Sequence, residues 1–297
     1  MSASDLQSLY IYMYPRKGNA NWLITMNKRL YLIKFISVSF IMLLLISGVF
    51  DIMSVRSLSA LGDLGEPRNA YDQGMAGILE GDIVVLSLFV NTPSDKWTVH
   101  EMNETLPKLQ TATDYLTKQA GDYKVDVSFN YDWSKDRKLR YRAIADFETD
   151  DKDFTDKLDE LIGSLVNGRI NYDDILSSYG ADGIFMMVYF NAPDRSYAIA
   201  YDGEDIPQET VIMFNDGDAA EYAHEILHVF GAHDFYDGEE YTDDVVKFIK
   251  KKYPDDIMLD TVMKKDEISN SIGPVTAYHI GWTDETKEFK EYDQLLR

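Results

Sequence analysis

The chain of 297 residues contains no cysteine. This absence excludes disulfide scaffolds, thiolate metal sites, cysteine nucleophiles and a lipid anchor on cysteine. Basic residues are also few, because 29 Lys and Arg stand against 51 Asp and Glu, which gives a formal net charge of -22. Since such a polyanion repels phosphate backbones, we expect no nucleic-acid partner. Histidine is scarce, with five residues, but a hydrophobic fraction of 45% is sufficient for a folded core.

The N-terminal region, which contains the longest apolar run, is nearly free of acidic residues. Residues 1–50 hold five basic residues and a single acid, Asp5, whereas residues 35–50 carry no charge. With the apolar residues just upstream, segment 30–50 is long enough to span a bilayer, for which about 20 residues are needed. The positive-inside rule then places residues 1–29 in the cytoplasm and the acidic remainder outside.

Two readings of this segment stay open. It is either an uncleaved single-pass signal-anchor in the cell membrane or the cleaved signal peptide of a secreted protein, because its length also suits a long signal core. We prefer the anchor, since no small-residue cleavage site directly follows Phe50. The anchor makes the lipid bilayer a partner of residues 30–50. Translation starts at Met1 or at Met26, which opens a typical basic leader.

The rest of the chain reads as a linker, residues 51–80, followed by one mixed α/β (α+β) domain at 81–297. Apolar runs predict strands near 83–90, 125–130, 140–147, 183–190, 197–201 and 210–214. Other segments predict helices near 98–119, 154–165, 243–252 and 275–281. We expect the sheet in an N-terminal subdomain, about 81–234, and a small helical C-terminal subdomain at about 235–297.

The segment that most clearly indicates a functional site is residues 218–236, DAAEYAHEILHVFGAHDFY. Asp218 and Glu221 form a helix-start pattern, so we expect a helix to begin near residue 219. His224 and His228 are four residues apart and share one helical face, where two imidazoles can bind one metal ion. Glu225 completes H-E-x-x-H, the pattern of a zinc-binding pair with a carboxylate general base.

A third metal ligand has to come from outside this pair. Gly231 favours the left-handed conformation that ends a helix, after which the chain turns back. His233 and Asp234 are both candidates on this reasoning, because imidazole and carboxylate groups both bind zinc. Glu267 is a more distant candidate, as in the H-E-x-x-H enzymes that take a glutamate from a later helix.

The run from His224 to Asp234, H-E-x-x-H-x-x-G-x-x-D, resembles the long motif of the metzincin metallopeptidases. Aspartate at the last position is similar to the snapalysin-type and immune-inhibitor-A-type bacterial peptidases. The resemblance implies Zn²⁺ bound by His224, His228 and Asp234, with Glu225 as the catalytic base. It also implies a twisted mixed sheet whose edge strand, sought at 183–201, pairs with extended substrate. The strand–helix material at 139–166 departs from the family pattern.

The same resemblance implies a methionine turn beneath the metal, for which Tyr253–Met258 is the candidate. Tyr278 is either a donor to the oxyanion of the reaction or a packing residue, and we prefer packing. We expect His279 to be structural and His100 to lie on the surface. The acidic stretches at 150–153, 216–218 and 255–256 read as solvated turns. A Ca²⁺ site there is an open alternative, although no EF-hand spacing is present.

These features predict a membrane-anchored or secreted zinc endopeptidase that acts on protein or peptide substrates outside the cytoplasmic membrane. One alternative is a non-catalytic surface protein with a structural zinc ion held by four ligands. The other is a module that captures extended peptides without cleaving them. Glu225 favours the enzyme, because a structural site has no use for that carboxylate.

Overall fold

The computed structural model describes residues 74–200, 209–235 and 243–283. The chain divides into two units, Met1–Ala60 and Leu61–Arg297, and all the described residues belong to the second. The predicted segments 1–29 and 30–50, and the first part of the predicted linker, lie outside the described residues. Within the described ranges, no helix has both the length and the apolar character that a membrane crossing requires.

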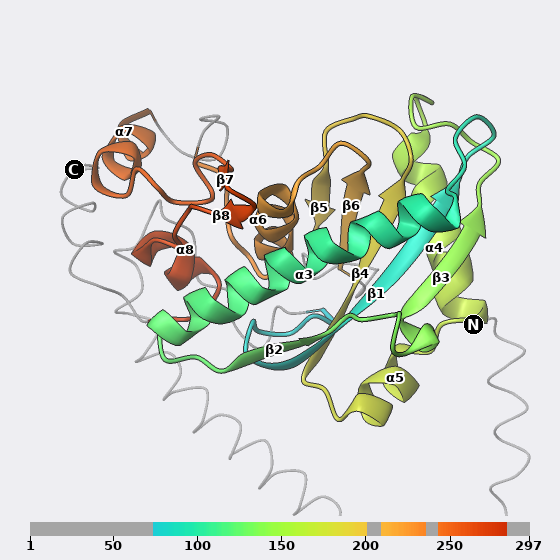
Figure 1. Cartoon of the computed structure of the whole chain (residues 1–297), viewed down its shortest axis with the longest axis horizontal. Coiled ribbons are helices and arrows are strands. Elements are labelled where there is room, and N and C mark those ends of the chain that lie inside the picture. The colour runs from blue at the N-terminus through green and yellow to red at the C-terminus, as the bar shows by residue number, and fades with distance from the viewer. Residues whose placement is uncertain (1–73, 201–208, 236–242, 284–297) are drawn as a thin grey trace, which may run out of the picture. The chain divides into compact units, whose positions relative to one another are not determined.

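A six-stranded sheet forms the centre of the second unit (Figure 1). Its strands are β1 (Gly81–Asn91), β2 (Val127–Asn130), β3 (Arg140–Ile144), β4 (Gly183–Phe190), β5 (Tyr197–Ile199) and β6 (Thr210–Phe214). The order is β2-β1-β4-β6-β5, and β3 also pairs with β1. Only the pairing of β5 with β6 is antiparallel. The sheet confirms the predicted mixed α/β class.

Strands β1 and β4 are the most deeply buried part of the sheet. Every residue from Ile83 to Val90 in β1 and from Gly183 to Phe190 in β4 is buried. Parallel strands that are covered on both faces have continuous apolar sequences, and these two runs are predicted as strands for that reason. Because β4 is interior, only β5 in the predicted edge region 183–201 lies at an edge of the sheet.

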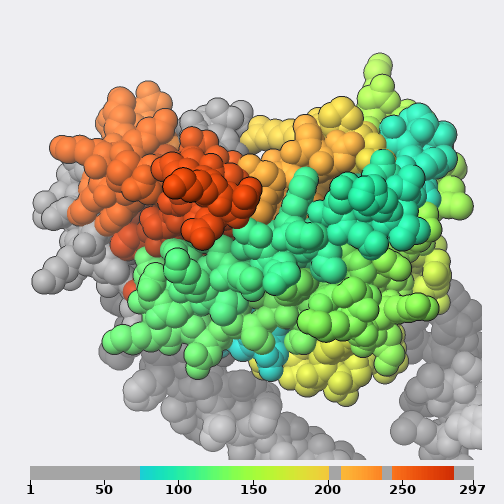
Figure 2. Space-filling model, in the orientation of Figure 1, coloured from blue at the N-terminus to red at the C-terminus, as the bar shows by residue number. Residues whose placement is uncertain are grey.

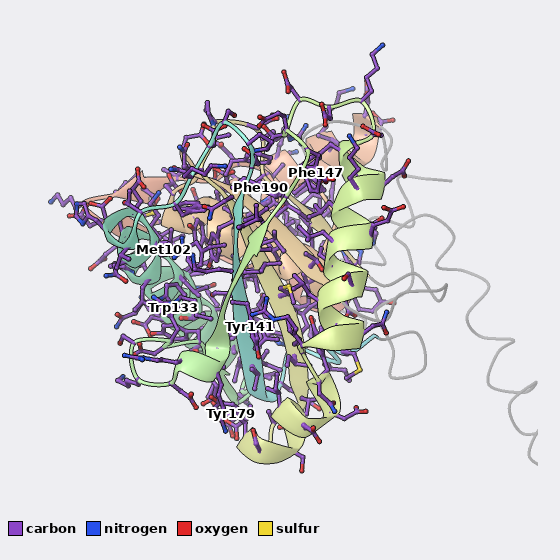
Figure 3. All side chains as sticks on the ribbon, turned by 90° about the vertical axis from the view of Figure 1, so that its right-hand side faces the viewer. Met102, Trp133, Tyr141, Phe147, Tyr179 and Phe190 are labelled. Atoms are coloured by element: carbon purple, nitrogen blue, oxygen red, sulfur yellow. The ribbon has the colours of Figure 1, made fainter. Side chains whose placement is uncertain are left out.

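Helices cover both faces of the sheet, as Figures 1 and 3 show. Helices α3 (Val99–Asp122) and α6 (Ala219–Val229) pack against each other on one face, and α4 (Phe154–Gly168) covers the other. Phe89 of β1 packs edge-on against Trp133, with ring centroids 5.6 Å apart. Phe154 of α4 packs similarly against Phe190 of β4, at 5.3 Å. These aromatic contacts join the sheet to both layers.

The segment 139–166, which departs from the metzincin pattern, completes one edge and one face of the sheet. The first half of β1, from Gly81, pairs with β2, and its second half, from Ser87, pairs with β3. A 3-10 turn at Arg137–Leu139 leads directly into β3. Helix α4 then packs on the sheet, and a further helix that the sequence does not predict, α5 (Tyr172–Tyr179), follows before β4.

The C-terminal elements gather at one end of the face that α3 crosses (Figure 2, orange to red). They are α7 (Asp243–Lys252), the hairpin of β7 (Met263–Lys264) and β8 (Glu267–Ile268), and α8 (Pro274–His279). The backbone of Ile272 joins them to α3: its N–H donates to Gln119 at 2.8 Å, and its carbonyl oxygen accepts from the Tyr123 hydroxyl at 2.7 Å. The two helices confirm the predictions at 243–252 and 275–281, whereas the hairpin is not predicted.

Residues 74–80, which the sequence prediction assigns to the end of the linker, pack on the domain. Ala76 and Leu79 are fully buried. The buried carboxylate of Glu209 accepts hydrogen bonds from the N–H groups of Gly74 and Ala76, at 3.1 and 2.9 Å. Trp282 donates its indole N–H to the carbonyl oxygen of Leu79. The folded domain therefore includes residues 74–80, ahead of the predicted boundary at 81.

Candidate metal centre

Helix α6 begins where the sequence predicts, because Asp218 caps it. The Asp218 carboxylate accepts hydrogen bonds from the N–H groups of Ala220 and Glu221, at 2.8 and 3.1 Å. The helix packs against α3 and against β5 and β6, and His224 on it is only 3% exposed. A capped and buried helix holds its side chains in fixed positions, as a metal site requires.

His224 and His228 bring their Nε2 atoms together, 3.2 Å apart. Their Nδ1 atoms contact backbone carbonyl oxygens: His224 Nδ1 lies 3.0 Å from that of Ile257, and His228 Nδ1 lies 2.8 Å from that of Ala232. Because a carbonyl oxygen can only accept, we assign the proton of each neutral ring to Nδ1. Each Nε2 then keeps its lone pair, which is the form that binds a metal.

The chain reverses directly after α6 and brings Asp234 to the same point. Gly231 has a φ of 96°, the left-handed conformation that the sequence predicts at this position. Asp234 Oδ1 lies 3.0 Å from His224 Nε2 and 3.3 Å from His228 Nε2. Three potential ligand atoms therefore converge from a single stretch of eleven residues, the one that resembles the metzincin motif.

The separations of these three atoms lie at or slightly below those expected of a tetrahedral zinc site. Ligand atoms at about 2.0–2.2 Å from zinc in tetrahedral geometry lie about 3.3–3.6 Å from one another. The observed separations are 3.0, 3.2 and 3.3 Å. Two imidazoles and one carboxylate are donors that zinc accepts, and three protein ligands leave a fourth position open.

Glu225 lies next to this cluster. It is 6% exposed, and its Oε2 has no hydrogen-bond partner among the described residues. His224, Glu225 and His228 also form a group of three metal-ligating side chains whose ligand atoms all lie within 4.8 Å of one another. Asp234 is the better candidate for the third ligand, because its Oδ1 lies within 3.3 Å of both histidine nitrogens.

The surroundings shift the pKa values of both carboxyl groups. Burial raises the pKa of Asp234, but the contacts of its carboxylate with His224 and His228, whose rings donate from Nε2 when they are protonated, outweigh burial and hold the pKa well below its usual range. Asp234 is therefore anionic at neutral pH. Burial raises the pKa of Glu225; the histidine charges oppose this shift, and those of Asp234 and Glu221 add to it. A buried carboxylate with a raised pKa is suited to taking up and returning a proton.

The predicted turn at Tyr253–Met258 contacts the cluster through its backbone. Ile257 supplies the carbonyl oxygen that orients His224. Met258 is fully buried, and its carbonyl oxygen accepts a hydrogen bond at 2.9 Å from the N–H of Phe235, the residue after Asp234. The turn therefore orients the His224 ring directly and holds the chain beside Asp234.

Asp256 corrects one sequence prediction, because it is not in a solvated turn. It is 1% exposed, whereas its neighbour Asp255 is exposed. The N–H groups of Met258 and Gly273 donate to its two oxygens, at 2.9 and 2.8 Å, and the Thr276 hydroxyl lies 2.9 Å from both. Burial raises its pKa to about 6, against the lowering effect of these bonds. This carboxylate ties the turn to the start of α8.

Two pockets open beside Glu225. The first, of about 600 Å³, is lined by His224 and Glu225 and by residues 194–196, which lead into β5. The second, of about 360 Å³, is lined by Glu225, His228 and Asp234 and by residues 195–198. Both pockets meet at Glu225, and both are bordered by the segment that forms the edge strand.

The other residues that the sequence suggests for the site are not part of the His224, His228 and Asp234 cluster. His233 borders the second pocket, and its ring packs edge-on against that of His279, with centroids 5.0 Å apart. Tyr278 is 5% exposed and is not among the residues that line either pocket, which favours a packing role. Glu267 is exposed in β8. The side chain of His100 is 84% exposed, as predicted.

The sequence matches no protein-family model, and no curated protein is significantly similar to it. The resemblance to the metzincins therefore rests on the residues between His224 and Asp234.

Proposed function

We propose that the chain is a zinc-dependent endopeptidase of the metzincin type. The observation that carries this proposal is the convergence of His224 Nε2, His228 Nε2 and Asp234 Oδ1 within 3.3 Å of one another, beside the buried carboxylate of Glu225. A mostly parallel sheet with an antiparallel edge strand against the motif helix supports the same assignment.

Peptide hydrolysis at this site would need two groups, a metal ion and the Glu225 carboxylate. Zinc at this site supplies a Lewis acid that lowers the pKa of a water molecule towards about 7. Glu225 accepts a proton from the attacking water and returns it to the leaving amine. The free Oε2 is the atom for that proton, and burial favours the transfer because it raises the pKa of the carboxyl group.

Strand β5 provides a place for an extended substrate. Among the described strands it pairs with β6 alone, and we propose that its other edge receives a further strand. A peptide added there gains backbone hydrogen bonds, and neighbouring pockets receive its side chains. The two pockets that meet at Glu225 would then hold side chains on either side of the cleaved bond.

We propose the cell membrane as the location, with residues 1–29 in the cytoplasm, segment 30–50 as the anchor and the peptidase domain outside. The support is the charge distribution and the apolar length of these residues in the sequence. Secretion after signal cleavage is the alternative, and the peptidase domain is extracytoplasmic in both.

A structural metal site is a second candidate, and one observation favours it. The Glu225 carboxylate lies within 4.8 Å of the ligand atoms of His224 and His228, so a fourth protein ligand is close at hand. If Glu225 bound the metal together with Asp234, the site would be closed to water. The chain would then be a structural or peptide-binding surface protein.

Four forms of the full-length chain in detergent separate these candidates: the parent, Glu225→Gln, Asp234→Ala and His233→Ala. Bound zinc per chain and cleavage of a quenched fluorescent peptide library are measured for each. We expect one zinc in the parent and its loss in Asp234→Ala. We expect Glu225→Gln to keep zinc but to cleave about 100-fold to 10,000-fold more slowly, because the general base is removed. His233→Ala is the matched control for zinc binding and should keep the zinc ion.

The other outcomes discriminate equally well. Zinc lost with Glu225→Gln would establish a closed structural site. A zinc-loaded parent that binds peptides without cleaving them would support the capture module. A folded parent that binds no zinc would refute the metallopeptidase and the structural-zinc candidates together.

A further inference from the structure

The pocket of about 600 Å³ beside Glu225 contains an excess of acidic side chains. Asp194, Asp216, Glu221 and Asp260 contribute four carboxyl groups to its lining. Arg195 is the single Lys or Arg among its described lining residues. We call this the acidic pocket.

These carboxyl groups come from separate parts of the fold. Asp194 precedes β5, Asp216 and Glu221 lie on either side of the start of α6, and Asp260 follows the turn at 253–258. Their convergence is therefore produced by tertiary structure and not by one acidic run. Like charges held in one concavity repel one another and create a negative potential, which attracts a cation.

Glu225 gives an independent indication that a ligand enters this pocket. It lines the same pocket and is 6% exposed, yet its Oε2 has no hydrogen-bond partner in the described part of the chain. Buried polar atoms in native proteins are almost always hydrogen-bonded, so an orphaned one next to an open pocket indicates a missing ligand group. A molecule that reaches Glu225 from this side lies against the four carboxyl groups.

The wall of the acidic pocket also provides apolar contact. Leu259, which is 8% exposed, lines the pocket next to Asp260. Lysine and arginine side chains bury an aliphatic stem against apolar surface while the charged head stays among polar groups. The pocket provides both kinds of surface, with Leu259 for the stem and the carboxylates for the head.

We propose that the acidic pocket selects substrates that carry a lysine or arginine side chain beside the cleaved bond. This inference rests on the proposed peptidase function and names its substrate class. The second pocket lacks this composition, since apart from the shared Glu225 its one carboxyl group is that of Asp234, which contacts both metal-site histidines. The preference therefore applies on one side of the cleaved bond.

Pairs of peptides that differ only by lysine or norleucine at one position test the proposal. The position is moved over the three residues on each side of the cleaved bond, and kcat/KM is measured with the zinc-loaded full-length chain. Partly exposed ion pairs of this kind change binding only modestly, so we expect a preference for lysine of about twofold to fivefold at one position. Added salt should weaken the preference, because it screens the carboxylates.

The double variant Asp216→Asn/Asp260→Asn should bring this ratio close to one for the same peptides. Its matched control, Asp150→Asn/Asp255→Asn, removes two exposed carboxyl groups that do not line the pocket and should keep the ratio. A ratio near one at every position in the parent, or the same ratio in both double variants, would overturn the proposal while leaving the peptidase function intact.

Failure of the peptidase function gives a different result, which is that no peptide is cleaved at all. Binding of the same peptide pairs to zinc-loaded Glu225→Gln, followed by fluorescence anisotropy, then decides the question. Tighter binding of the lysine peptide that disappears when Asp216 and Asp260 are also replaced by asparagine would support selection by the pocket. Equal binding of both peptides would overturn it.

Discussion

Replacing Asp256 with alanine tests how the turn at 253–258 is held against the metal centre. The N–H groups of Met258 and Gly273 both donate to this carboxylate, and alanine leaves them buried without an acceptor. Ile257, whose carbonyl oxygen orients His224, lies within the same turn. We therefore expect Asp256→Ala to reduce stability and also to weaken zinc binding, although Asp256 is not a ligand.

Two opposing contributions set the change in the free energy of unfolding. Each buried N–H left without an acceptor costs about 1–3 kcal/mol, so the loss is about 2–6 kcal/mol. The pKa of Asp256 is raised from 3.8 to about 6 in the folded protein. Protonated Asp256 therefore stabilises the folded state. This stabilisation is fully present below pH 3.8 and is lost as the pH rises through about 6. At neutral pH the buried, ionised carboxylate destabilises the folded state by about 3 kcal/mol. Its removal in Asp256→Ala offsets the loss of the hydrogen bonds by that amount.

It follows that Asp256→Ala destabilises the protein more at acid pH than at neutral pH. Urea unfolding in the presence of a chelator, at about pH 5 and about pH 7.5, measures this difference above the isoelectric point of about 4.5. We expect the destabilisation to be about 1.4 kcal/mol larger at the lower pH. Asp255→Ala is the matched control; because Asp255 is exposed, its effect should stay within about 0.5 kcal/mol at both pH values.

Zinc affinity provides the second readout at neutral pH. Loss of a group that supports a metal ligand typically lowers affinity about 10-fold to 100-fold, and we expect this for Asp256→Ala but not for Asp255→Ala. A destabilisation that does not change with pH would refute the raised pKa. Indistinguishable behaviour of the two variants would refute the role of Asp256 in the turn.

Two further predictions come from the packing. At Gly273 an added Cβ would lie 2.4 Å from Asp256 Oδ2, so thermal unfolding should show Gly273→Ala to be destabilised by about 1–3 kcal/mol. Gly121→Ala in α3, where no atom lies within 4 Å of the added Cβ, should be neutral or stabilising by up to about 1 kcal/mol. Glu209→Ala removes the acceptor for the N–H groups of Gly74 and Ala76, so limited proteolysis should cut residues 74–80 faster; an unchanged rate would show that other contacts hold this segment.

Local sequence signals predict much of the fold. The runs that become β1, β4 and β6 are almost continuously apolar because most of their residues are buried. The start of α6 is predicted because capping is a local interaction, in which Asp218 bonds to N–H groups two and three residues away. Gly231 likewise acts locally, since its left-handed conformation is a property of one residue.

Long-range contacts account for what the sequence does not predict. Asp256 follows Pro254 and Asp255, a typical surface turn, and only its bonds to Gly273 and Thr276, 17 and 20 residues later, make it a buried acceptor. Residues 74–80 look like the end of a linker because segment 51–80 mixes glycine, serine, arginine and aspartate with little periodicity, yet Glu209, more than 130 residues away, holds their backbone. Helix α5 is missed because it is short and buries only Tyr172 and Ile175.

The motif contains every proposed metal ligand, but it does not make the site alone. His224 depends on the carbonyl oxygen of Ile257 for the orientation of its ring, and the chain beside Asp234 depends on the carbonyl oxygen of Met258. The predicted boundary between subdomains, after Asp234, therefore runs through the candidate site. A chain that ended there would keep all the proposed ligands and lose the hydrogen bonds that the turn at 253–258 makes with His224 and with the residue after Asp234. Orientation of the ligands by the C-terminal segment thus explains why a turn 33 residues after His224 belongs to the site.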